Sequence, residues 1–122
     1  MTEEGRARLA RAAFWLAAAF ALVMASLPHP PSVPGTTDKV QHMLAFAVLT
    51  LLAVLAFPRT AWWRIALGLS LFGIAIEVVQ AIPALHRDSD WLDWVADTAA
   101  VAAMLALIAV VRPLLGRTFG RR

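Results

Sequence analysis

The sequence predicts an all-α transmembrane bundle of four helices. Apolar residues make up 61% of the 122 residues, well above the roughly 45–50% that is usual in soluble domains. They gather in four runs of about 16–22 residues, close to the length that an α-helix needs to cross a bilayer. These runs lack the polar stripe that each helix of a soluble bundle keeps toward water. The chain is short enough to form one domain, residues 1–122.

We predict helices over residues 12–27, 39–57, 61–82 and 91–111. The first is followed by a proline-rich segment, residues 27–37, which is expected to form an extended loop. Thr37 or Asp38 can cap the second helix, and Asp38 with Gln41 three residues later fits a capping box.

The last helix has recognisable boundary residues. Ser89 or Asp90 can cap its start, and Trp91 with Trp94 is typical of an interfacial aromatic belt. Arg112 with Pro113 is expected to end the helix, because proline removes a backbone donor and clashes with the preceding turn.

The first run has a second interpretation. Arg6, Arg8 and Arg11 precede an alanine-rich segment, and Val23-Met24-Ala25 resembles the end of a signal peptide with cleavage after Ala25. We expect the segment to be retained, because it is long enough to span the membrane and a fourth helix helps to cover the polar ones.

The basic residues predict the orientation of the bundle. With both termini inside, nine of the 11 Lys and Arg residues fall on one side, and only Lys39 and Arg87 fall on the other. The positive-inside rule therefore places both termini in the cytoplasm. We expect the protein to lie in the bacterial cytoplasmic (inner) membrane. This distribution also explains the net charge of +3 without nucleic acid as a partner. The nine residues are Arg6, Arg8, Arg11, Arg59, Arg64, Arg112, Arg117, Arg121 and Arg122.

Ionisable residues occur at the outer ends of three of the predicted helices. His42 follows Asp38 by four residues, Gln80 follows Glu77 by three, and Asp97 follows Asp93 by four, so each helix presents one polar face. Because polar groups facing lipid are costly, we expect these faces to meet around an outward-open pocket.

The ordered set of polar residues resembles the VanZ-like family of membrane proteins over about residues 37–108. The family commonly has asparagine where this chain has Asp97. The resemblance implies a cell-envelope setting, and the family's namesake is associated with low-level resistance to the glycopeptide teicoplanin. The matching residues are Asp38, Lys39, His42, Glu77, Gln80, Arg87, Asp93 and Asp97.

The first functional hypothesis is that the protein recognises the anionic head group of a lipid-linked envelope precursor. The lipid bilayer around the helices is the other expected partner. Arg87 would bind a phosphate or carboxylate through its fork of donors, and Lys39 would add a point charge. No cofactor is expected. The predicted ligand-binding residues are Lys39, His42, Glu77, Gln80, Arg87, Asp93 and Asp97.

Three other interpretations remain open. A hydrolase or transferase would use Glu77 or Asp93 as general base with His42 as its acid partner, and a metal variant would use the same three residues as ligands. A small transporter is the second alternative. In a purely structural interpretation, Lys39 and Arg87 neutralise Glu77 and Asp93 and so hold the helices together. The chain has no cysteine, which excludes disulfides and thiolate ligands.

Overall fold

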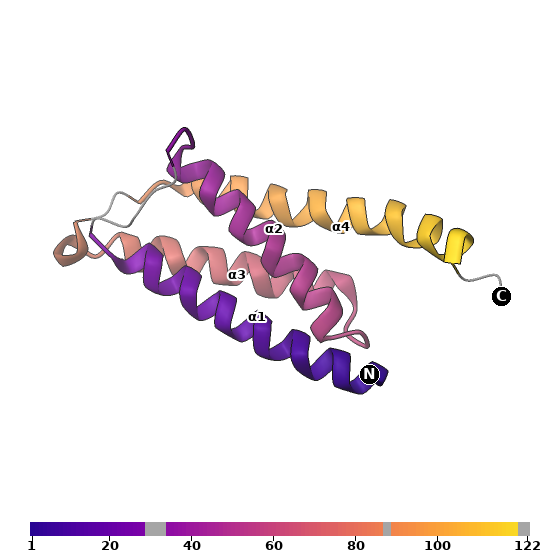
Figure 1. Ribbon diagram of the computed structural model, residues 1–122. Coiled ribbons are helices and arrows are strands. Elements are labelled where there is room, and N and C mark those ends of the chain that lie inside the picture. The colour runs from indigo at the N-terminus through magenta and orange to yellow at the C-terminus, as the bar shows by residue number, and fades with distance from the viewer. Residues whose placement is uncertain (29–33, 87–88, 120–122) are drawn as a thin grey trace.

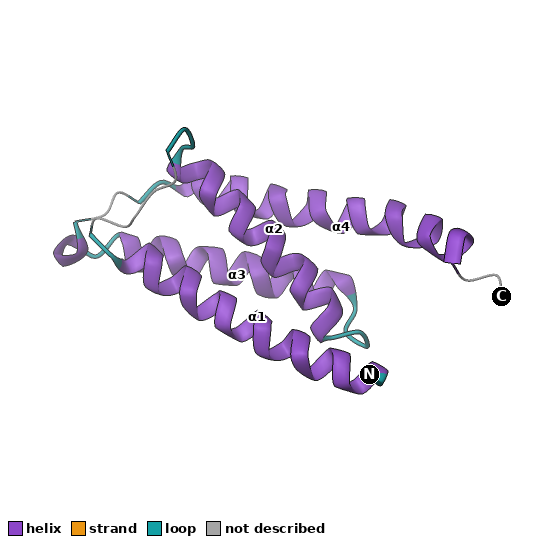
Figure 2. Ribbon diagram, in the orientation of Figure 1, coloured by secondary structure: helices purple, strands orange, loops and turns teal. Residues whose placement is uncertain are grey.

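The computed structural model describes residues 1–28, 34–86 and 89–119, and these residues form four long helices (Figure 1). The helices are α1 (Glu3–Ser26), α2 (Asp38–Ala56), α3 (Trp62–Gln80) and α4 (Trp91–Phe119), with a short 3-10 helix η1 (Pro83–Leu85) after α3. Figure 2 shows no strand in the described part of the chain. Each long helix is apolar enough to cross a membrane, which confirms the predicted all-α transmembrane bundle.

The start of α1 and the end of α4 lie at the same end of the bundle (Figure 1), as an even number of membrane crossings requires. We call this the inner end and the opposite one the outer end, following the charge distribution. The orientation with both termini in the cytoplasm stays a prediction. Part of the proline-rich segment expected as an outer loop, residues 29–33, lies outside the described residues.

Helix α1 begins nine residues earlier than residue 12, where the apolar run starts. Thr2 caps it, because its hydroxyl oxygen accepts a hydrogen bond from the backbone N–H of Gly5 at 3.0 Å. Glu3 and Glu4 occupy the first turn, where carboxylates interact favourably with the helix dipole. The predicted helix was too short because its start was placed at the first residue of the apolar run. The polar residues before that run are also helical, and the N-terminal cap stabilises their first turn.

The prediction that Arg112 and Pro113 end the last helix is wrong. Pro113 lies inside α4, which continues to Phe119. A proline removes one hydrogen bond and strains one turn, but the apolar residues Leu114 and Leu115 continue the helix beyond it. Membrane-spanning helices tolerate such a break where neighbouring groups adjust. As a result, α4 projects past the other helices at the inner end (Figure 1).

Helix α2 lies at the centre of the bundle and contacts the other three long helices. Its buried face consists of Phe46, Leu49, Thr50, Ala53 and Val54, which recur at the three- and four-residue spacing of one helical face. Helix α1 packs mainly on α2, and α4 packs on both α2 and α3. The buried core therefore runs along α2.

Gly73 allows α3 and α4 to approach closely. A Cβ atom at this position would lie 3.2 Å from Cδ1 of Trp94 and 3.6 Å from Cζ of Phe46. The contact with Trp94 would be tighter than ordinary packing, whereas the contact with Phe46 would be an ordinary van der Waals contact. The missing side chain thus makes room for the Trp94 indole beside the core.

Arg11 connects α1 to the inner end of α2. Its Nη1 donates to the carbonyl oxygen of Ala56 at 3.1 Å, and its Nη2 donates to Oε1 of Glu4 at 2.9 Å. Ala56 is the last residue of α2, so its carbonyl has no partner within the helix. Arg11 therefore satisfies a helix terminus with a charged donor.

The surfaces of α1 and α4 that face away from the other helices are apolar. In the most apolar 18-residue stretch of each helix, only 6% is buried in α1 and in α4, against 33% in α2 and 28% in α3. Leu16 and Phe20 on α1 and Leu107 and Val110 on α4 are among the exposed residues. A surface this apolar is expected for helices that face lipid.

Candidate functional site

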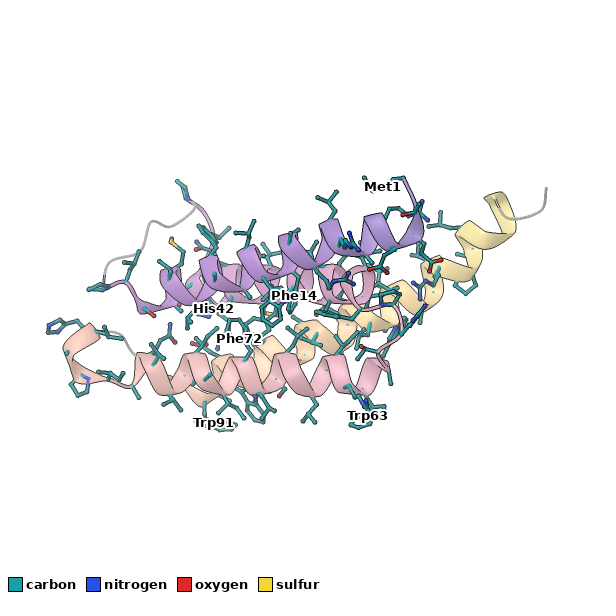
Figure 3. The ribbon with its side chains drawn as sticks, turned by 90° about the horizontal axis from the view of Figure 1, so that it is seen from below. Met1, Phe14, His42, Trp63, Phe72 and Trp91 are labelled. Carbon is teal, nitrogen blue, oxygen red and sulfur yellow. The ribbon has the colours of Figure 1, made fainter. Side chains whose placement is uncertain are left out.

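Polar side chains from α2, α3 and α4 lie at the outer end of the bundle. Figure 3 shows His42 and Trp91 toward this end and Met1 and Trp63 toward the inner end. Three of the polar side chains, Glu77, Gln80 and Asp97, are buried. We call the whole set the polar layer: Asp38, Lys39, His42, Glu77, Gln80, Ser89, Asp90, Asp93 and Asp97.

Asp38 and His42 are paired along α2. Nε2 of His42 lies 3.7 Å from Oδ2 of Asp38, as the i,i+4 spacing predicts. Asp38 is the first residue of α2, and Thr37 is the cap, its hydroxyl accepting from the N–H of Val40 at 3.2 Å. The predicted capping box of Asp38 with Gln41 is wrong, because Nε2 of Gln41 instead donates to Oγ1 of Thr36 at 2.8 Å.

Lys39 joins α2 to α4. Its Nζ lies 3.4 Å from Oδ1 of Asp93. The lysine side chain is 44% exposed and the aspartate side chain 15% exposed. The structural interpretation expected Lys39 to neutralise an acid of this layer, and the structure assigns Asp93 to it. The lysine is therefore the more accessible member of the pair.

Glu77 holds the connection between α3 and α4. Its Oε2 accepts hydrogen bonds from the hydroxyl of Ser89 at 3.1 Å and from the backbone N–H of Asp90 at 3.0 Å. Ser89 also donates to the backbone carbonyl of Glu77 at 3.1 Å. Asp90 caps α4, because its Oδ1 accepts from the N–H of Leu92 at 3.0 Å, as predicted. The role of Ser89 as a partner of Glu77 was not predicted.

Gln80 joins α3 to α1. Its Nε2 donates to the carbonyl oxygen of Ala25 at 3.3 Å, and both residues are buried. The sequence placed Gln80 on the polar face of α3, but it gave no sign that the partner is a backbone carbonyl near the end of α1.

Asp97 is the least exposed acid of the layer. It is 1% exposed, and neither carboxyl oxygen has a hydrogen-bond partner among the described residues. The same holds for Oε1 of Glu77, Oε1 of Gln80 and Nδ1 of His42. Buried polar atoms usually have partners, so these enclosed acceptors are an unusual feature of the layer, and donors from another molecule can reach them only when the side chains around them move apart.

A second polar contact continues inward from the layer between α3 and α4. Nε1 of Trp94 donates to the hydroxyl of Ser70 at 3.0 Å, and this hydroxyl lies 3.2 Å from that of Thr98. The sequence assigned Trp94 to the membrane interface together with Trp91. Trp91 is exposed, but Trp94 turns toward α3 and packs at Gly73. The sequence alone does not show that Trp94 packs against small residues of α3, because this contact depends on how α3 and α4 are placed relative to each other.

The three candidate catalytic and metal-binding residues each have another partner in the structure. His42 pairs with Asp38, Asp93 pairs with Lys39, and Glu77 binds the segment before α4. Within the described ranges, no group of three or more His, Cys, Asp or Glu residues is placed to hold a metal ion. Arg87, the second predicted cation of the site, lies outside the described residues.

Two hollows open beside the polar layer. The larger, about 370 Å³, runs between α1 and α2 and includes Asp38, Gln41 and His42 in its lining. The smaller, about 290 Å³, lies between α3 and α4 and is lined by Glu77, Ser89, Trp91 and Trp94 among others. Asp38 and His42 are thus reached from one side of the layer and Glu77 from the other, whereas Gln80 and Asp97 line neither hollow.

No protein-family model, no curated protein and no solved structure matches this chain. The resemblance to the VanZ-like family therefore rests on the residues already described. The chemistry of the polar layer is the other basis for a function.

Proposed function

We propose that this chain is a VanZ-like, multi-pass protein of the bacterial cytoplasmic membrane. Its polar layer binds the head group of a lipid-linked cell-envelope precursor in the outer leaflet. By binding such precursors, it contributes to resistance against glycopeptide antibiotics that act on the envelope. The proposal is supported by the ordered polar residues, by four membrane-length helices, and by the chemistry of the layer.

The observation that carries the proposal is the set of buried acceptors without donors. Oε1 of Glu77, Oε1 of Gln80 and both carboxyl oxygens of Asp97 have no partner among the described residues. Leaving such a group unsatisfied costs about 1–3 kcal/mol, and more when it is charged. A head group with several hydroxyl or amino donors would satisfy them after the side chains that enclose these atoms move apart. Sugars and glycerol, which are common in envelope lipids, present such donors.

Lys39 supplies the contact for the anionic part of the same head group. Its side chain is partly exposed, and its ammonium nitrogen lies 3.4 Å from Asp93, a separation longer than the roughly 2.7–2.9 Å of a strong charge-assisted hydrogen bond. A phosphate can therefore approach Lys39 without displacing Asp93. Carboxylates outnumber cations in the described layer, so they accept hydrogen bonds from donors and repel additional phosphates. The favoured head group therefore combines one phosphate with several donors.

The test is lipid binding by the purified protein in nanodiscs of phosphatidylcholine. Phosphatidylglycerol, which has one phosphate and two hydroxyls, is the probe for this head-group chemistry. It is expected to bind in preference to phosphatidylcholine, which has no hydrogen-bond donor. Lys39→Gln should lower the affinity for phosphatidylglycerol about tenfold, equivalent to about 1.4 kcal/mol. Arg64→Gln, at the inner end, is the matched control and should leave it unchanged. Equal affinities of the two variants would remove Lys39 from the site.

A cellular measurement links binding to resistance. Cells that express the protein are expected to tolerate a higher teicoplanin concentration than cells without it. Lys39→Gln should lose this tolerance at equal membrane abundance, and Arg64→Gln should keep it. Tolerance that survives Lys39→Gln would separate the envelope effect from this site.

A further inference from the structure

The groove between α1 and α2 has apolar walls along most of its length. Its lining includes Ala17 and Ala21 of α1 and Ala45 and Val48 of α2. The alanines leave space where larger side chains would close the groove, and its volume of about 370 Å³ lies within the roughly 300–1,000 Å³ of ligand pockets.

The groove has the depth of one leaflet. On α2 its lining runs from Asp38 to Leu49, which is about 16 Å at a rise of about 1.5 Å per residue. Half of a hydrocarbon core about 30 Å thick is about 15 Å. The groove therefore begins at the outer polar layer and ends near the middle of the membrane.

The groove is open to the bilayer from the side. Phe20 of α1 and Leu44 and Val48 of α2 belong to its lining and are 67%, 59% and 52% exposed. In a membrane-spanning chain these side chains contact lipid. A lipid chain can enter between them without crossing the head-group region.

Polar atoms line only the outer end of the groove, on the first turns of α2, through Asp38, Gln41 and His42. Nδ1 of His42 is buried and has no partner within the described residues, whereas Nε2 faces Asp38. The polar end of the groove is therefore at the level where the head group of an outer-leaflet lipid lies.

We infer that this groove holds one hydrocarbon chain of the lipid whose head group binds in the polar layer. The inference rests on the proposed function and adds the tail site to it. The ligand is then an outer-leaflet lipid with a phosphate and hydroxyl donors at one end of the groove. Its chain follows Ala21 and Ala45 toward the centre of the membrane.

The test uses phosphatidylglycerol with a photoreactive diazirine midway along one acyl chain, incorporated at low abundance into phosphatidylcholine nanodiscs with the full chain. Mass spectrometry then locates the cross-linked residues. We expect cross-links to concentrate on groove residues such as Phe20 and Leu44, and not on Leu16 and Val23, which are exposed on α1 but do not line the groove. Equal labelling of both faces of α1 would overturn the tail site.

Substitutions supply matched controls. Ala21→Phe fills the groove and should lower its labelling about tenfold. Ala19→Phe, an equal change at an exposed position outside the groove, should leave labelling unchanged. Unaltered labelling in Ala21→Phe would contradict the inference. If Ala21→Phe does not fold, the distribution of cross-links in the unmodified chain still decides.

The same experiment separates the tail site from the proposed function. Diazirine phosphatidylcholine that labels the groove as strongly as the phosphatidylglycerol probe would keep the tail site and remove head-group recognition. Preference for phosphatidylglycerol with labelling spread over all lipid-facing helices would do the reverse. A disulfide-linked dimer formed efficiently by Ala21→Cys, in a chain with no other cysteine, would assign the groove to a second copy and overturn the inference.

Discussion

Gln80 of α3 donates a hydrogen bond to the backbone carbonyl of Ala25 near the end of α1 at 3.3 Å. Both residues are buried, and Ala25 also lines the groove between α1 and α2. The contact therefore fixes α1 against α3 at the level of the polar layer. It gives α1, which also resembles a signal peptide in sequence, a defined place in the packing of the outer end.

Replacing Gln80 with Glu is expected to destabilise the bundle. The change removes the amide donor: a carboxylate cannot donate to the Ala25 carbonyl, and the neutral acid can do so only after taking up a proton, so we expect a cost of about 1–3 kcal/mol. Gln41→Glu is the control, because the Thr36 hydroxyl can donate to a carboxylate there, and its effect should stay within about 0.5 kcal/mol. Denaturant unfolding of the detergent-solubilised protein measures both, and equal stabilities would contradict the role of Gln80.

Arg11 should contribute more to stability than Arg8. Arg11→Leu leaves the last carbonyl of α2 and the carboxylate of Glu4 without this donor, with an expected loss of about 1–3 kcal/mol. Arg8 lies 3.8 Å from Glu4 in an exposed pair, so Arg8→Leu should change the free energy of unfolding by less than about 1 kcal/mol. Both variants remove one inner positive charge, which keeps the comparison balanced. The reverse order of stabilities would count against the Arg11 contact.

The space at Gly73 should be needed for packing. Gly73→Leu must displace Trp94 or Phe46, and overpacking of this kind typically costs about 1–3 kcal/mol. At Gly68, where a Cβ would meet nothing within 4 Å, the same change should be neutral or stabilising by up to about 1 kcal/mol because leucine favours helix. Thermal unfolding of the two variants checks this. A Gly73→Leu protein as stable as Gly68→Leu would show that α3 and α4 do not meet here.

The orientation of the bundle can be measured by labelling single cysteines, since the natural chain has none. Thr36→Cys, before α2, should react with a membrane-impermeant maleimide in intact spheroplasts. Thr60→Cys, between α2 and α3, should react only after the membrane is opened. The basis is the excess of arginine at the inner end. Labelling in the opposite order would invert the bundle and place the polar layer on the cytoplasmic side.

Much of the fold follows from apolar run length. The predicted limits of the second and third helices differ from α2 and α3 by at most two residues, because membrane length and flanking polar residues define both ends. The start of α1 and the end of α4 were missed. Thr2 extends the first helix through a side-chain cap, and Pro113 does not stop the last one. Neither effect depends on hydropathy.

The members of the polar layer could be predicted, but their partners could not. Spacing along a helix places Glu77 and Gln80 on one face, yet it does not say which helix that face meets or how it is rotated. Glu77 therefore binds Ser89, and Gln80 binds a backbone carbonyl of α1. Lys39 had two candidate acids, and only the packing of α2 on α4 selects Asp93.

The position of a lipid phosphate relative to Lys39 tests head-group binding most directly. Lys39 is the only lysine in the chain, so ¹⁵N-lysine labelling gives a single side-chain Nζ signal in solid-state NMR. In bilayers that contain phosphatidylglycerol, we predict strong dephasing of this signal by ³¹P, as expected for a phosphate oxygen about 2.8 Å from Nζ. A Nζ signal without phosphorus dephasing under these conditions would contradict head-group binding at the polar layer.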